Sequence, residues 1–216
     1  MQKIYSVSTL FLFSVLLFSC QNDTAHVKEQ FGEGIIQSED SVVIFYKSIT
    51  FIPDKKNIDT SKLKTDVSLF FYQPYAGKVH TIKTFEKINN WPAAWQTHLA
   101  YSENLVGFSL KNTRKNKRNE NEGIYLYNIG KSKIRKIEDH GEKFWISPDE
   151  KLLLYHLINE NRKTYRLYGY DTEEDKTSLY NESQPMIKNI EWLENGKAAL
   201  LITEKKDSAI RIDLKN

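Results

Sequence analysis

The stretch SPDEKLLLY at residues 147–155 joins a tight polar turn to a short apolar run, and a weaker copy, LENGKAALL, stands at 193–201. The same pattern occurs around Ser102, in LAYSENLVGFSL, and around Ser38, in IIQSEDSVVIFY. Successive copies are 64, 45 and 46 residues apart. Internal repetition near this period is typical of repeat arrays and propellers.

A second phrase follows each copy and alternates apolar with polar residues. The four phrases are DVSLFFYQPYAGKVHTI from 66, EGIYLYNIGKSKIRKI from 122, TYRLYGYDTEEDKTSLY from 164 and SAIRIDLKN from 208. Period-2 alternation around Gly-containing turns predicts hairpins, so each repeat predicts four short strands. Twelve Tyr and eleven Phe against two Met favour strands as well.

These repeats predict an all-β chain, a β-propeller of about four four-stranded blades at approximately 31–90, 91–139, 140–185 and 186–216. The last repeat ends after its third strand. A strand from residues 25–31 would complete it in a closed ring, and the alternative is an open partial propeller.

The third repeat also resembles a known family. Its SPDEKL and LYGYD phrases are similar to the SPDGK and LYxxD phrases of the WD40-like repeats in TolB-type propellers, with Glu150 in place of the usual Gly. The resemblance spans roughly residues 31–216 and implies a propeller fold. Pro148 and Asp149 are expected to shape the turn, Pro148 by fixing φ and Asp149 by bonding local backbone.

The N-terminal segment predicts an export signal. Residues 1–19 combine Lys3 with an apolar run of about 16 residues, which is short for a spanning helix. The sequence LFSC at 17–20 resembles the lipobox of bacterial lipoproteins, which implies lipidation of Cys20, the only cysteine. Residues 20–30 then form the lipidated tether or the closing strand, and residues 31–216 form the propeller-like domain. The predicted location is the bacterial cell envelope, the outer membrane in a Gram-negative cell.

Composition and motifs exclude several classes of protein. With 216 residues, 40% hydrophobic and 27% charged, the chain is expected to fold as a globular domain, and a formal charge of +3 gives no argument for nucleic acid. No phosphate-binding loop or Gly-x-Ser-x-Gly elbow occurs, and the five histidines lack metal-ligand spacing. No cofactor, metal site or catalytic residue is therefore predicted.

Two groups of residues are candidates for binding. A basic run in the connection between the middle strands of the second repeat offers a positive surface to an anionic envelope surface or to an acidic protein, or is a solvated loop; it contains Lys111, Arg114, Lys115, Lys117 and Arg118. Tryptophans in or before the innermost strands pack between blades, or form a ligand pocket; the three candidates are Trp95, Trp145 and Trp192.

The sequence thus predicts an envelope-anchored, non-catalytic propeller lipoprotein that binds a protein partner or acts as a scaffold. One alternative is a small-ligand or glycan binder that uses the central pocket. A further alternative is an enzyme with a site on one ring face, for which the sequence offers no catalytic constellation.

Overall fold

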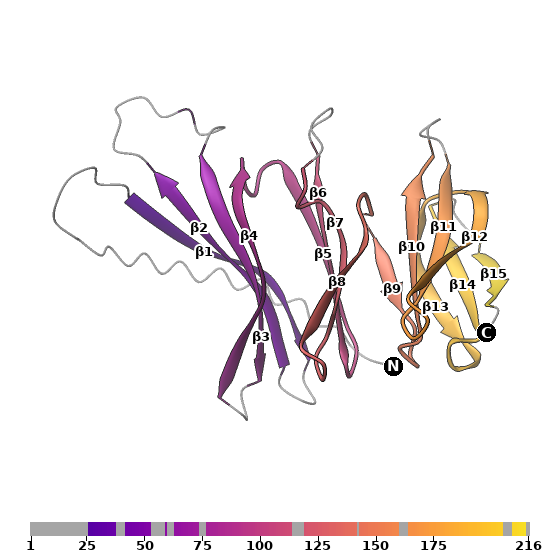
Figure 1. The fold of residues 1–216 in the computed structure, drawn as a ribbon. Coiled ribbons are helices and arrows are strands. Elements are labelled where there is room, and N and C mark those ends of the chain that lie inside the picture. The colour runs from indigo at the N-terminus through magenta and orange to yellow at the C-terminus, as the bar shows by residue number, and fades with distance from the viewer. Residues whose placement is uncertain are drawn as a thin grey trace. The chain divides into compact units, whose positions relative to one another are not determined.

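The computed structural model describes residues 26–37, 42–52, 59, 63–73, 77–113, 119–141, 143–159, 164–204 and 209–214 (Figure 1). Over these residues the chain forms β-strands, turns and one short 3-10 turn, Glu194–Gly196. The chain divides into two compact units, residues 1–95 and 96–216, and each is described separately.

The first unit holds one antiparallel sheet of four long strands in the order β1-β2-β3-β4. The strands are β1 (His26–Gln37), β2 (Val42–Ile52), β3 (Lys64–Gln73) and β4 (Lys78–Asn89).

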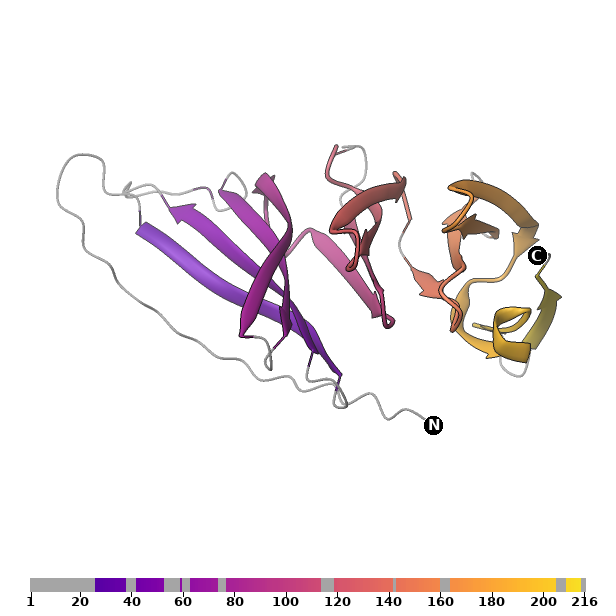
Figure 2. The same cartoon turned by 60° about the horizontal axis from the view of Figure 1, so that its bottom comes forward.

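The second unit holds three antiparallel sheets, each built from strands that follow one another in sequence (Figure 2). The second sheet contains β5 (Trp95–Tyr101), β6 (Leu105–Asn112), β7 (Gly123–Asn128) and β8 (Lys133–Glu138). The third contains β9 (Phe144–Ile146), β10 (Leu152–Ile158), β11 (Tyr165–Asp171) and β12 (Lys176–Gln184). The fourth contains β13 (Ile187–Leu193), β14 (Ala198–Thr203) and β15 (Ala209–Asp213).

The predicted fold class is confirmed, because the described residues form an all-β structure in which three sheets have the four sequential strands of a propeller blade and the fourth sheet has three. The proposed closing strand is wrong, because residues 26–31 belong to β1, where His26 is aligned with Ile52 of β2. Within β1, Glu29 forms an ion pair with Lys47 of β2, at 3.1 Å.

The first sheet has one buried face and one accessible face. Side chains at alternate positions of β2 and β3 are buried, among them Ile44, Tyr46, Val67 and Leu69. Because successive side chains of a strand point to opposite faces, the intervening residues lie on the accessible face.

The second and third sheets pack face to face through an apolar cluster. Phe144 of β9 and Leu153 of β10 meet Leu105 of β6 in it, and all three are almost fully buried. Gly107 of β6 makes room for this contact, since a Cβ atom there would lie 2.3 Å from Cε2 of Phe144. The glycine therefore lets an aromatic ring lie directly on the neighbouring strand.

A second cluster joins the third and fourth sheets. Its buried members include Leu154 of β10, Leu167 of β11 and Leu201 of β14. Trp145 of β9 and Trp192 of β13 are partly buried and pack against this cluster. Each sheet of the second unit is thus held to the next by apolar burial, as the repeat pattern requires.

Candidate functional site

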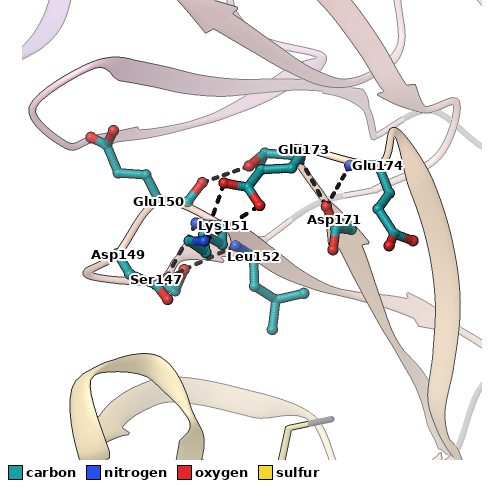
Figure 3. Close-up of polar contacts among 9 residues, drawn as sticks. Ser147, Asp149, Glu150, Lys151, Leu152, Asp171, Glu173 and Glu174 are labelled. Atoms are coloured by element: carbon teal, nitrogen blue, oxygen red, sulfur yellow. Dashed lines mark hydrogen bonds and ion pairs between the residues drawn. The ribbon is translucent and has the colours of Figure 1, made fainter. Parts of the chain in front are cut away.

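The turn that carries the SPDEK phrase is closed by its own side chains (Figure 3). The Ser147 hydroxyl donates to Oδ1 of Asp149 at 2.6 Å and accepts the Leu152 backbone N–H at 3.0 Å. The same Oδ1 accepts the backbone N–H of Lys151 at 3.2 Å. Asp149 therefore has the local turn role that the sequence predicted.

Glu150 connects this turn to the second sheet. Its φ of 61° is left-handed, the conformation in which glycine is usual and other residues are strained. Its two carboxylate oxygens accept from the backbone N–H and the side-chain amide of Asn104, at 2.7 and 3.0 Å. The glutamate thus replaces the glycine of the related phrase and gains a bond between neighbouring sheets.

The turn between β11 and β12 lies beside the SPDEK turn. The Thr172 hydroxyl donates to the Glu150 carbonyl at 2.7 Å, and the Lys151 ammonium lies 3.2 Å from Oε1 of Glu173 (Figure 3). Oδ1 of Asp171 accepts the backbone N–H groups of Glu173 and Glu174 at 2.8 and 2.7 Å. These bonds connect the SPDEK turn to the turn between β11 and β12. We call these two connected turns the rim.

A second polar network joins the same two sheets. Arg135 of β8 donates to the Tyr170 hydroxyl at 2.6 Å, and that hydroxyl donates to Oδ1 of Asp175, also at 2.6 Å. Arg135 also forms an ion pair with Asp175. Burial raises the pKa of Tyr170, with a further contribution from the hydrogen bond to Asp175, so the hydroxyl keeps its proton at neutral pH.

Two grooves lie along the rim. The first, of about 450 Å³, lies between the second and third sheets, with Leu105, Leu126 and Tyr170 among its lining residues. The second, of about 600 Å³, lies between the third and fourth sheets and includes Asp149 and Gly196. Neither groove is lined by a tryptophan. Within the described part of the chain, no group of three or more His, Cys, Asp or Glu residues is placed to hold a metal ion.

His98 of β5 makes a polar contact across the sheets. Its ring lies edge-on to Phe144, and its Nε2 lies 3.1 Å from the Phe144 carbonyl oxygen, to which it donates. Burial lowers the pKa of His98 below the usual 6.5; Lys143 lowers it further, and the bond to Phe144 partly opposes the change. The folded protein therefore holds the neutral imidazole.

We expect the second unit to lose stability when the pH falls below about 6.5, the ordinary pKa of histidine. The pKa of His98 is lower in the folded state than in the unfolded state. The neutral imidazole therefore contributes its full stabilisation at a pH above the unfolded-state pKa. This stabilisation is lost as the pH falls toward the folded-state pKa. Urea unfolding of His98→Gln between about pH 7.5 and about pH 5.5 should show a weaker pH dependence than the parent protein. The exposed, non-titrating Thr97 of the same strand provides the control, since Thr97→Ala should retain the parent's pH dependence. An equal pH dependence in His98→Gln and the parent would contradict this.

The accessible face of the first sheet is a second candidate for function. Among the described residues, four of the six exposed large apolar side chains lie on it: Val27 (51% exposed), Phe31 (52%), Phe51 (46%) and Val79 (56%). The strand register places them on one face, because Val27 is opposite Phe51, Phe31 is opposite Lys47, and Val79 is opposite Tyr72. We call this the open face. Its exposed apolar side chains distinguish it from an ordinary solvated sheet face, which is mainly polar.

The structure places only some of the predicted site residues. Trp95 is 8% exposed, donates through Nε1 to the Asn89 carbonyl at 3.0 Å, and lies beside Trp91. Trp145 and Trp192 each pack against the core between the third and fourth sheets. Lys111 lies near the end of β6. Cys20, Arg114, Lys115, Lys117 and Arg118 lie outside the described residues, and within the described part no helix is long and apolar enough to cross a membrane.

Sequence reasoning missed both the open face and the first groove. The alternation of Lys133 and Arg135 along β8 was a usable signal for one wall of the groove, because a period of two places the side chains of a strand on one face. For the open face, the signal was the presence of Val27, Phe31 and Phe51 at strand positions away from the repeat phrases.

Comparisons with known proteins identify distant structural likenesses. No family model matches the chain, and no curated protein matches it. Among solved structures, TolB from Acinetobacter baumannii is 10% identical with a TM-score of 0.33, and the match covers 82% of this chain and 61% of TolB. The tricorn protease is 12% identical with a TM-score of 0.48, covering 85% of this chain and 20% of the protease. A luciferin-regenerating enzyme is 11% identical with a TM-score of 0.36, covering 84% and 75%.

Proposed function

We propose that this chain is a non-catalytic protein-binding module of the bacterial envelope, lipid-anchored at Cys20, that binds another protein through the open face of its first sheet. The observation that carries the proposal is the exposure of Val27, Phe31, Phe51 and Val79 on that face. Exposed apolar surface bordered by polar groups is typical of protein interaction sites.

The open face is large enough for a specific partner. Its four strands are 10 to 12 residues long. With strands about 4.8 Å apart and a rise of about 3.3 Å per residue, the face covers roughly 600 Å². Two partners would together bury roughly 1,200 Å², the lower end of the range for stable protein complexes.

The polar groups of the face favour recognition of a protein surface. Lys47 pairs with Glu29 at 3.1 Å, and its ammonium lies 5.9 Å from the centre of the Phe31 ring. Ser68 and Thr84 bond to each other through their hydroxyls at 2.9 Å. Because these groups are already paired within the sheet, a partner covers them at a smaller desolvation cost than it would for unpaired groups. The partner expected is a folded protein with an apolar surface of its own.

The test is a cross-linked pull-down of full-length protein from its native envelope, analysed by mass spectrometry. The double substitution of Phe31→Ser and Phe51→Ser should remove a stoichiometric partner that the parent protein captures. The matched control is the double substitution of Ile158→Ser and Leu179→Ser, since these side chains are exposed to a similar extent, 49% and 45%, on the third sheet. Retention of the partner by the first variant, or its equal loss from both, would reject the open face as the binding surface.

The predicted basic run offers a second comparison in the same experiment. If the run at 111–118 is the docking site, the partner disappears when its lysine and arginine charges are removed and remains when Phe31 and Phe51 are changed.

A further inference from the structure

The strand β15 lies at one edge of the fourth sheet. It pairs with β14 along one side, and no other strand of the described residues lies along its second side. Backbone N–H and C=O groups along the edge of a sheet are a template for pairing with a further strand. The second side of β15 is therefore a candidate surface for strand pairing.

The register with β14 shows which backbone groups point to this second side. The Leu214 N–H donates to the Lys197 carbonyl at 2.9 Å, so these two residues form a hydrogen-bonded pair. Hydrogen-bonded pairs alternate along an antiparallel ladder, so Ile212 also directs its backbone groups to β14. The backbone groups of Arg211 and Asp213 therefore point away from β14, toward the second side.

The side chains of this segment alternate between the two faces of the sheet. Ile210 and Ile212 are partly buried and pack against the core between the third and fourth sheets, to which the buried Leu214 also belongs. Arg211 and Asp213 lie on the opposite, exposed face. The sequence IRIDL at 210–214 is thus apolar at both ends and at its centre, with opposite charges on the two sides of Ile212.

We propose that β15 pairs with β15 of a second copy of this chain, antiparallel and centred on Ile212. In this register Arg211 of each copy lies opposite Asp213 of the other, and the two residues exchange the backbone hydrogen bonds that point away from β14. Ile212 lies opposite its own counterpart, and Ile210 lies opposite Leu214. The cores of the two fourth sheets therefore become continuous along the shared edge.

The charges select this register over its neighbours. A pairing centred on Arg211 would place arginine opposite arginine, and one centred on Asp213 would place aspartate opposite aspartate. Like charges directly opposite each other destabilise an antiparallel pair, and unlike charges stabilise it. Arg211 already bonds Glu194 and Asp213 of its own chain, at 2.6 and 3.2 Å, and the facing Asp213 joins this exposed network. Charge therefore fixes the register, while backbone bonds and apolar pairs supply the affinity.

The resulting dimer is weak and reversible. The contact is the edge of one strand of five residues, which covers much less than the roughly 1,200 Å² of a stable complex. A covalent cross-link that traps the pair is therefore the suitable measurement. The contact uses the fourth sheet alone, so it can fail or succeed independently of protein binding through the open face.

The test is disulfide cross-linking of full-length Ile212→Cys in its native envelope under mild oxidation, followed on a non-reducing gel. Opposite Cα atoms of a non-hydrogen-bonded pair are about 4.5 Å apart, which is within reach of a disulfide. Ile210→Cys is the matched control, because the two copies of position 210 would be offset by about 13 Å along the strands. Ile212→Cys should form a dimer that a reducing agent separates, whereas Ile210→Cys and the parent, whose one cysteine is Cys20, should form none.

Charge substitutions added to Ile212→Cys test the register. Arg211→Asp alone, or Asp213→Arg alone, places like charges opposite each other at both ends of the pair and should lower the dimer yield about tenfold. The two changes together restore unlike pairs and should recover the yield. The proposal is overturned if Ile212→Cys forms no dimer, if Ile210→Cys forms as much, or if the combined charge exchange yields no more dimer than the single changes.

Discussion

Substitution of Phe144 by Ala should lower the free energy of unfolding of the second unit by about 3 to 5 kcal/mol, the usual cost of removing a buried phenylalanine. Phe144 is fully buried, lies on Gly107 of the next sheet, and accepts the His98 hydrogen bond through its carbonyl. The backbone of β6 and β9 cannot close around the missing ring, so a cavity should remain between the sheets. Domains are stable by only about 5 to 15 kcal/mol, so the loss is a large part of the total.

The measurement is urea unfolding followed by tryptophan fluorescence, in which Trp145 and Trp192 report on the second unit. The two compact units need not unfold together, so the transition assigned to the second unit is the one to compare. Phe31→Ala is the matched control, since this ring is 52% exposed and its removal should cost no more than about 0.5 kcal/mol. A loss below about 1 kcal/mol for Phe144→Ala would show that the two sheets do not pack as described.

Substitution of Cys20 by Ser should move the protein from the membrane fraction to the soluble fraction. The prediction follows from the lipobox-like LFSC sequence at 17–20 and from the absence of any other cysteine. Acyl chains gain about 0.8 kcal/mol for each buried CH₂ group, and two or more chains hold a protein stably at a membrane. Loss of the acylated residue should therefore remove nearly all of the membrane affinity.

Fractionation of cells that express the parent or Cys20→Ser measures this directly. Intact mass spectrometry of the parent should also show a chain that begins at Cys20 and carries added acyl mass. Membrane retention of Cys20→Ser, together with an unmodified parent chain that still contains residues 1–19, would favour an uncleaved anchor helix.

The sequence predicted the local structure of the repeats well, because the turn and strand signals are local. The Ser147 and Asp149 bonds close the turn where the SPDEK phrase predicted one. Even the departure from the related phrase has a physical explanation, since Glu150 keeps the left-handed φ of 61° and uses its carboxylate to bind Asn104.

The surfaces proposed for binding could not be predicted in the same way, because exposure depends on which faces other sheets cover. Alternation in β2 distinguishes Tyr46 from Lys47, but it does not show that the face of Phe31 and Phe51 stays accessible. The length of β1 depends on its pairing with β2, from His26 opposite Ile52 to Gln37 opposite Val42, and this pairing joins residues that local sequence signals do not connect.

Site-specific photo-cross-linking in the native envelope tests the central claim most directly. A photoreactive amino acid at position 51, on the open face, should give one dominant cross-linked protein partner. The same group at position 179, on the exposed surface of the third sheet, should give none. An absence of cross-links from position 51, or the same products from both positions, would contradict protein binding through the open face.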